Sequence, residues 1–123
     1  MARAEAAGVR REAILLDPGV GFGKRAEHSF ETLARLDALS ALDRPILAGA
    51  SRKSFLKRAL GDKAPAARDW GTAAAVTASV LGGAHIVRVH NVAAMLDVVR
   101  VADAIRAALA SSSGVHATHP KHP

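Results

Sequence analysis

Hydrophobic positions fall into three short runs, and a longer segment with a different period follows each run. The runs cover residues 13–17, 46–49 and 85–90. Short apolar runs bounded by glycine or proline are typical of buried strands, whereas apolar residues that recur every three or four positions are typical of amphipathic helices. The pattern therefore predicts three strand-loop-helix units in succession.

The helical period is clearest in the segments that follow these runs. Helices are predicted over residues 29–42, 55–60, 73–81 and from Asn91, as an N-cap, to Leu109, and residues 1–8 have the pattern of the last turns of a further helix. Parallel strands need crossover connections, which helices usually provide. The chain is therefore predicted to be an α/β protein with a parallel sheet.

Composition predicts one domain over residues 1–109 and a disordered tail over residues 110–123. The chain has 123 residues, of which 50% are hydrophobic, and this is enough for one core. The last residues contain Ser, His and Pro without periodic apolar positions. The tail histidines have spacings that could hold a metal on a helix, but Pro120 and Pro123 oppose one, so a solvated tail is favoured; they are His116, His119 and His122.

Charge and residue usage limit the class of partner. The formal net charge of +6 favours an anionic ligand. The basic residues are spread along the chain and there is no Tyr, which argues against a nucleic-acid surface. No cysteine is present, the first residues lack an apolar signal region, and the alanine-rich runs are too short to span a membrane. We expect a cytoplasmic protein with a small anionic ligand.

Residues that could bind a ligand or take part in catalysis lie where each predicted strand ends. They occupy 17–24 after the first strand, 49–54 after the second and 88–90 at the end of the third. The carboxyl ends of parallel strands meet at one edge, which is where ligands bind in α/β barrels and open sheets alike. These three segments are therefore predicted to form one site.

The first segment contains Asp17 and the glycine-rich loop 19–24. It lacks the third glycine of a dinucleotide fingerprint, because Lys24 stands there, and it lacks the spacing and hydroxyl of a P-loop. A carboxylate at the end of a buried strand needs donors. A backbone cap and a ligand bearing N–H groups both remain open for Asp17.

The other two segments are rich in cations. Residues 51–54 read Ser-Arg-Lys-Ser directly before a helix, an arrangement that favours anion binding, although Arg52 also fits an ordinary helix cap with a solvated charge. Arg88 lies in an apolar strand and needs a planar or anionic partner, and His90 on the same face can add a donor. His85, on the opposite face, is predicted to be a structural histidine covered by a helix.

Four motifs together resemble the dihydropteroate synthase family. They are Asp17-Pro-Gly-Val-Gly-Phe-Gly-Lys24, Gly49-Ala-Ser-Arg-Lys-Ser54, Arg68 with Gly71-Thr72, and Arg88-Val-His90. The resemblance covers residues 1–109. It implies the last part of a (β/α)8 TIM barrel: the end of the fifth helix, and strands six to eight with their helices.

This resemblance implies a transferase of folate biosynthesis. Such an enzyme joins p-aminobenzoate to 6-hydroxymethyl-7,8-dihydropterin diphosphate and releases pyrophosphate in the presence of Mg2+. Asp17 would accept hydrogen bonds from the pterin, Arg88 and His90 would hold the diphosphate, and Phe22 and Ser54 would form the p-aminobenzoate end. The implied catalytic residues are Lys53, Arg88 and His90, and the implied substrate-binding residues are Asp17, Phe22, Gly49, Ser51, Lys53, Ser54, Arg88, Val89 and His90.

The chain departs from the family pattern in one residue and in length. Asn91 stands where the family usually has Asp, a change that keeps an N-cap. Three of eight barrel units are present, and the family's metal-side Asn has no counterpart. We therefore expect an inactive chain that associates with itself or needs the missing barrel portion. The alternatives are a non-catalytic pterin-binding homologue, an inactive truncated fragment, and a methyltetrahydrofolate methyltransferase, which the Ser-Arg-Lys-Ser segment disfavours.

Overall fold

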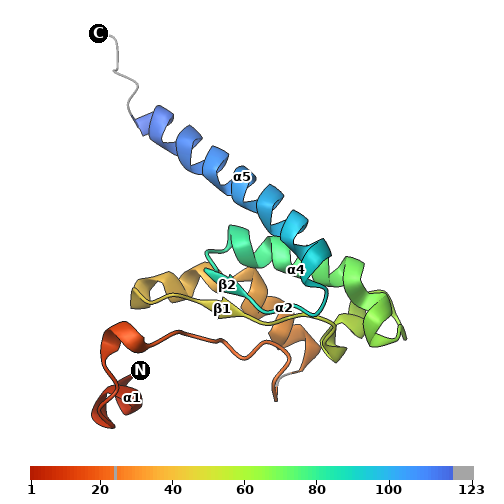
Figure 1. The fold of residues 1–123 in the computed structure, drawn as a ribbon, viewed down its shortest axis with the longest axis horizontal. Coiled ribbons are helices and arrows are strands. Elements are labelled where there is room, and N and C mark those ends of the chain that lie inside the picture. The colour runs from red at the N-terminus through yellow and green to blue at the C-terminus, as the bar shows by residue number, and fades with distance from the viewer. Residues whose placement is uncertain (24, 118–123) are drawn as a thin grey trace.

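The computed structural model describes residues 1–23 and 25–117, with side chains up to residue 112, and its elements follow the predicted order (Figure 1). The α-helices and strands are α1 (Ala2–Ala6), α2 (Ala26–Ala34), β1 (Leu47–Ala48), α3 (Lys57–Leu60), α4 (Asp69–Leu81), β2 (Ile86–Val87) and α5 (Val92–Ala117). Short 3-10 helices lie between them: η1 (Arg11–Ala13), η2 (Leu36–Leu42), η3 (Ser54–Leu56) and η4 (Pro65–Arg68).

The described strands form a small parallel sheet. β1 pairs with β2 in the register Leu47 to Ile86 and Ala48 to Val87. On the other side of β1 a single parallel bridge joins Leu16 to Ile46, and the Leu47 N–H donates to the Leu16 carbonyl at 2.8 Å. The order of segments across the sheet is therefore their order in the sequence, as parallel α/β units require.

The predicted strand over residues 13–17 is longer than the structure allows. Ala13 belongs to the 3-10 helix η1, and the segment contributes only the bridge at Leu16. Ile14 is buried but Leu15 is 51% exposed. This segment pairs on one side only among the described residues, so little of its backbone is held in a ladder.

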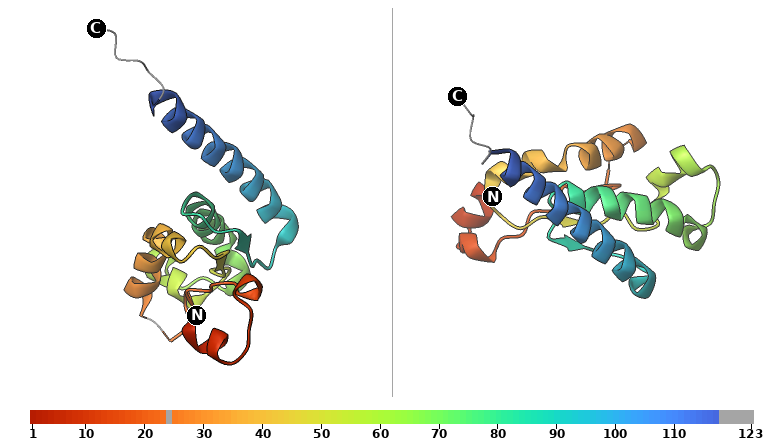
Figure 2. Two further views of the ribbon diagram at one scale, coloured as in Figure 1. Left: turned by 90° about the vertical axis from the view of Figure 1, so that its left-hand side faces the viewer. Right: turned by 90° about the horizontal axis from the view of Figure 1, so that it is seen from above.

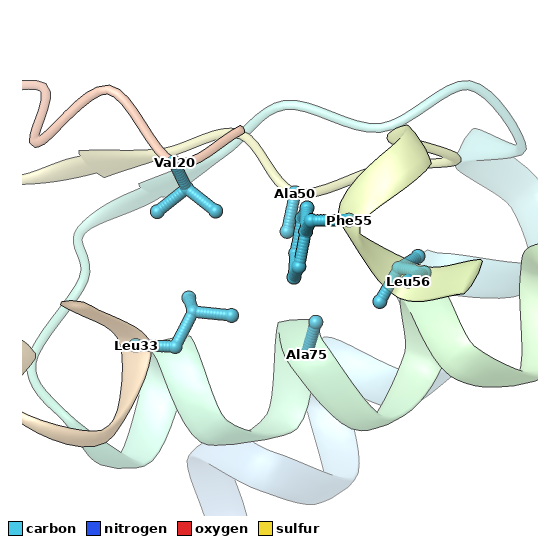
Figure 3. Close-up of a cluster of buried hydrophobic side chains, with 6 residues drawn as sticks. All are labelled: Val20, Leu33, Ala50, Phe55, Leu56 and Ala75. Carbon is cyan, nitrogen blue, oxygen red and sulfur yellow. The ribbon is translucent and has the colours of Figure 1, made fainter. Parts of the chain in front are cut away.

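α4 packs against the sheet, and α2 and α5 pack against α4. Ile46 and Ala48 point into this layer beside Leu36 and Ala84. A second cluster joins the glycine-rich loop to the helices, and Phe55 meets Phe30 edge to face with ring centroids 5.2 Å apart. Figure 3 shows its buried members, which are Val20, Leu33, Ala50, Phe55, Leu56 and Ala75. Since strand side chains alternate, Leu47 and Gly49 lie on the opposite face.

The helix predicted over residues 29–42 is divided in the structure. α2 ends at Ala34, and Arg35 leaves the helical region with φ of −117° and ψ of 27°. The chain continues as the 3-10 helix η2, which ends at Asp43 with φ of 52°. The break accompanies a change of packing, because Leu36, directly after it, is 1% exposed and belongs to the cluster with Ile46.

α5 continues through Ala117, beyond residue 109, where the sequence predicts that the domain ends and a disordered tail begins (Figures 1 and 2). The helix packs on α4 through Met95 and Ala102, which are buried beside Val76 and Val80, and then projects from the body. Ala and Ser continue a helix at modest cost, and the first proline comes at residue 120. His119 and His122 lie outside the described residues. No helix in the described part of the chain is long and apolar enough to cross a membrane.

Candidate functional site

An open cleft of about 420 Å³ lies at the carboxyl edge of the sheet. It is lined by Asp17, Leu47, Gly49, Ser51, Lys53, Arg88, Val89 and His90. The sequence predicts all of these except Leu47. The signal for Leu47 is present in the strand alternation, since its neighbours Ile46 and Ala48 face the helices and it must face the cleft.

The structure does not bring every predicted residue into the cleft. Phe22 is 83% exposed in the glycine-rich loop and does not line the cleft. Ser54 is exposed at the first position of η3 and is also outside the lining. Lys24 lies outside the described residues. The assignment of Phe22 and Ser54 to the p-aminobenzoate end therefore stays a prediction.

Lys53 joins the loop after the first strand to the loop after β1. Its Nζ donates to the Val20 carbonyl oxygen at 2.7 Å. Its aliphatic stem passes over Gly21, where a Cβ atom would lie 2.7 Å from Lys53 Cδ and where φ is +75°. The Gly21 N–H donates to Oγ of the buried Ser29 at 3.0 Å. Gly21 is required at this position because any side chain would be strained and would displace Lys53.

Asp17 is capped and also lines the cleft. Its Oδ1 accepts a hydrogen bond from the Gly19 N–H at 2.8 Å, and the side chain is exposed at the cleft. A carboxylate has two oxygens and about four lone-pair sites, so this backbone cap does not use its whole accepting capacity. The cap and a ligand with N–H groups are compatible roles for Asp17.

Arg88 and Lys53 both lie beside Gly49, which has no side chain. A Cβ atom on Gly49 would lie 3.8 Å from Lys53 Nζ and 3.9 Å from Arg88 Cβ, so the glycine leaves the space between the cations open. Among the side chains that the structure describes, in residues 1–23 and 25–112, the Arg88 guanidinium finds no hydrogen-bond or ion-pair partner. A cation without a protein partner at a cleft favours an anionic or planar ligand.

Ser51 connects the loop after β1 to the end of β2. Its buried Oγ accepts from the His90 N–H at 3.1 Å and lies 2.8 Å from His90 Nδ1. When the Ser51 hydroxyl donates to Nδ1, the neutral ring carries its proton on Nε2. His90 can then offer an N–H donor to a ligand.

His85 has a structural partner, but it is not covered as predicted. Its Nδ1 accepts a hydrogen bond from the Ile46 N–H at 3.2 Å. The residue is exposed, so helices do not bury it. The prediction of a satisfied histidine is confirmed, and that of helical cover is wrong.

Arg52 is not the solvated cap residue that the sequence allowed. It adopts φ of +57° and forms a two-point ion pair with Asp69, with Nε to Oδ1 at 2.9 Å and Nη2 to Oδ2 at 3.2 Å. Both side chains are only 26% exposed. Asn91 Nδ2 also donates to Asp69 Oδ2 at 3.3 Å. Sequence reasoning did not identify Asp69, since no local pattern joins residues so far apart in the chain.

This ion pair sets the charge of its members. The hydrogen bond from Arg52 lowers the pKa of Asp69 below its usual value, and the bond from Asn91 and the charges of Arg52 and His90 act in the same direction, while desolvation opposes them. The hydrogen bond with Asp69 raises the pKa of Arg52. Both groups are therefore charged at neutral pH.

The lowered pKa of Asp69 predicts a contribution to stability that acid removes. A carboxyl group whose pKa is lower in the folded state stabilises the fold above its unfolded pKa of about 4, and this contribution is lost as the pH falls through the folded pKa. The free energy of unfolding of Asp69→Asn, measured by urea denaturation between neutral and acid pH, should therefore fall less with decreasing pH than that of the unmodified chain. This part of the pH dependence is called the acid limb.

The matched control for this measurement is Asp62→Asn. Asp62 is 97% exposed, and its Oδ1 lies 3.8 Å from Lys57 Nζ, so its removal should leave the acid limb unchanged. Identical acid limbs for Asp69→Asn and the unmodified chain would contradict the role of the ion pair.

The cleft does not fit a magnesium ion held by this chain. Mg2+ prefers oxygen ligands in octahedral geometry. The cleft offers the carboxylate of Asp17, already capped through one oxygen, together with the cations Lys53 and Arg88. No group of three or more His, Asp or Glu residues that could hold a metal is found in the part of the chain that the structure describes.

Comparison with known proteins identifies the family. The family described as "Pterin binding enzyme" matches residues 1–90. The chain belongs to this pterin-binding enzyme family. Dihydropteroate synthase from Synechocystis is 48% identical over 98 residues, which are 80% of this chain and 34% of the relative. Dihydropteroate synthase from Escherichia coli is 41% identical over 104 residues, or 85% of this chain and 36% of the relative.

Solved structures of pterin-binding enzymes are also similar to the fold. A dihydropteroate synthase from Clostridium difficile, determined in the presence of pteroic acid, has a TM-score of 0.80 and 45% identity over 85% of this chain and 39% of that chain. The Yersinia pestis enzyme with a pterin-sulfa conjugate has a TM-score of 0.82 and 37% identity over 87% of this chain and 42% of that one. The chain thus spans about a third of the length of these curated relatives.

Proposed function

We propose that this chain is the part of a dihydropteroate synthase that carries strands six to eight of its (β/α)8 TIM barrel. The support is the sequential order of three parallel segments with helices on one face, together with the share of the relatives that the chain covers, 34% and 36%. Three of eight units are close to that share. The helical layer corresponds to the outer ring, and the cleft to the inner, carboxyl-terminal face.

The observation that carries this proposal is the meeting of an acceptor and two cations in one cleft. Asp17, Lys53 and Arg88 come from three successive strand ends and line the same space. Asp17 accepts hydrogen bonds from the ring and amino N–H groups of a pterin, and Lys53 holds the pterin from the opposite side. Arg88 lies against the ring and, with His90, holds the diphosphate. A ligand that is rich in N–H groups at one end and anionic at the other matches this arrangement.

The proposed reaction is condensation of 6-hydroxymethyl-7,8-dihydropterin diphosphate with p-aminobenzoate. The amine attacks the pterin methylene carbon, the carbon–oxygen bond to the diphosphate breaks, and the amine nitrogen loses one proton to solvent, so that 7,8-dihydropteroate and pyrophosphate form. Lys53, Arg88 and His90 stabilise the negative charge that develops on the departing group. Asp17 orients the pterin, so catalysis is electrostatic and positional, without a protein nucleophile. Phe22 and Ser54 belong to the p-aminobenzoate end of this proposal.

Activity requires more than this chain provides. The chain spans about a third of the length of its relatives, and the remaining barrel strands supply the other pterin contacts that the resemblance implies. We propose that the isolated chain lacks synthase activity and that its sheet edges associate with the missing portion or with a second copy. A cytoplasmic location and a Mg2+ requirement of the complete enzyme are parts of the same proposal, with no magnesium ligand assigned to this chain.

Two other functions make different predictions for binding. A non-catalytic pterin-binding homologue would bind the pterin without turnover in any assembly, and an inactive truncated fragment would bind nothing. A methyltetrahydrofolate methyltransferase is disfavoured by the curated relatives at 41% and 48% identity, which are synthases. The binding measurement below separates an inactive fragment from a chain that binds the pterin, and a synthase assay on the assembled barrel separates a synthase from a non-catalytic homologue.

Calorimetry tests the proposal on the chain itself. Titration with 6-hydroxymethyl-7,8-dihydropterin diphosphate should release or absorb heat that saturates, and Lys53→Met should remove most of this binding. Lys57→Met is the matched control, because Lys57 is exposed on α3 and is absent from the cleft lining. Binding by Lys53→Met equal to that of Lys57→Met would contradict the proposed site, and absence of binding by the unmodified chain would favour the inactive fragment.

A further inference from the structure

Arg52 has an uncommon backbone conformation that surrounding side chains hold in place. Its φ of +57° is unfavourable for a residue with a Cβ atom. The Arg52 N–H donates to Thr72 Oγ1 at 3.0 Å, and the Arg52 carbonyl accepts from Nη1 of the buried Arg68 at 2.7 Å. Asp69 binds the guanidinium at two points. A strained residue persists only where its surroundings determine it so fully, and such residues cluster at functional sites.

The turn at Arg52 determines the directions of its two neighbours. Ser51, on one side, reaches the His90 backbone and ring. Lys53, on the other side, reaches the Val20 carbonyl over Gly21. Both neighbours line the cleft. The conformation of Arg52 therefore directs the hydroxyl group of the preceding residue and the ammonium group of the following residue into one site.

Asn91 connects the same carboxylate to the other wall of the cleft. Asn91 Nδ2 donates to Asp69 Oδ2 at 3.3 Å, while Asn91 Oδ1 accepts from the Ala94 N–H at 3.3 Å and caps α5. Asn91 directly follows His90 in the chain. Asp69 at the start of α4 thus contacts the turn that carries Ser51 and Lys53 and also the residue next to His90.

We propose that Asp69 is a positioning residue that holds the two walls of the anion-binding cleft at a fixed separation through Arg52 and Asn91. This inference rests on the proposed function, since it assigns Asp69 a role at the same site without contact with substrate. The amide of Asn91 is essential to it. An Asp at this position would cap α5 equally well but would face Asp69 with a second carboxylate.

The sign of one effect separates positioning from bulk charge. Asp69→Asn makes the chain more positive, so electrostatics alone would strengthen the binding of an anion. Positioning has the opposite consequence, because the neutral amide weakens the hold on Arg52 and presents N–H donors to the Asn91 amide. Asp62→Asn changes the net charge equally at a residue outside the cleft lining.

The test is a calorimetric titration with inorganic pyrophosphate, combined with NMR hydrogen exchange at the Arg52 amide. Asp69→Asn should bind pyrophosphate about 5-fold more weakly, and its Arg52 amide hydrogen should exchange faster. Both effects are expected because Asp69 contacts Arg52 and holds the turn in place. Asn91→Asp should also bind pyrophosphate more weakly and show faster hydrogen exchange at the Arg52 amide, while its helix content by circular dichroism stays unchanged. The double variant that combines Asp69→Asn with Asn91→Asp should recover part of the affinity. Asp62→Asn should bind as tightly as the unmodified chain or more tightly.

The inference is overturned if Asp69→Asn and Asn91→Asp, both folded, keep the pyrophosphate affinity and the Arg52 exchange rate of the unmodified chain. If Asp69→Asn does not fold, Asn91→Asp decides the question, because it keeps the cap. If the unmodified chain binds no pyrophosphate, the proposed function fails at this step. The positioning role is then judged by hydrogen exchange alone: faster exchange at the Arg52 amide in the two variants supports it, and unchanged exchange refutes it.

Discussion

Arg88→Met is expected to weaken the binding of 6-hydroxymethyl-7,8-dihydropterin diphosphate by about 10- to 100-fold, the range for loss of a charged hydrogen bond. Arg88 lines the cleft, and its guanidinium makes no hydrogen bond or ion pair to the described residues. The substitution should therefore cost the fold little and the ligand much. Calorimetry on the folded variant measures the loss.

Arg100→Met is the matched control for this prediction. Arg100 is an exposed arginine on α5 and does not line the cleft, so the control removes the same charge from a position away from the ligand. Its small long-range effect should fade with added salt. If both variants bind the diphosphate with the same affinity, Arg88 does not contact it and the proposed orientation of the pterin is wrong.

Arg68→Leu is expected to lower the free energy of unfolding by about 2–5 kcal/mol, as loss of a buried polar network does. Arg68 is 5% exposed, and it donates from Nε to the Lys63 carbonyl at 2.9 Å and from Nη1 to the Arg52 carbonyl at 2.7 Å. Leucine leaves both carbonyls without these donors and releases the strained turn at Arg52. Urea unfolding at neutral pH measures the change.

Arg58→Leu provides the comparison for Arg68→Leu. Arg58 is 66% exposed, and its Nη1 lies 2.7 Å from Glu27 Oε1. Exposed ion pairs contribute about 0–1 kcal/mol to the free energy of unfolding. Equal losses in the two arginine variants would show that the buried hydrogen bonds of Arg68 are not what stabilises this region. A large loss in Arg68→Leu alone supports its place in the turn.

The strand ends of the site could be predicted because topology alone brings them together. Parallel strands place their carboxyl ends at one edge, so the sequence predicts that Asp17, Lys53 and Arg88 meet there. Leu47 was not predicted, although the alternation of strand residues between faces would have placed it at the cleft. The supports of the site could not be predicted in this way. The pairing of Arg52 with Asp69 depends on a left-handed turn that no local pattern indicates.

Element lengths were harder to predict than element positions. The expected strand over 13–17 reduces to a bridge at Leu16, because only one side of this segment is paired among the described residues. α5 extends past the point where apolar periodicity stops, because alanine and serine continue a helix without a hydrophobic face to support it. Composition indicates whether a segment can be buried, and it is a weaker guide to whether the segment stays helical.

The most direct test of the central claim is a synthase assay on a mixture of this chain and a separate chain that carries the rest of the barrel. We expect no formation of 7,8-dihydropteroate by either chain alone, measurable formation on mixing, and loss of this formation when Lys53→Met replaces the unmodified chain. Lys57→Met should support formation normally. Two folded chains that associate and yet form no product would contradict the assignment of this chain as the part of a dihydropteroate synthase that carries strands six to eight.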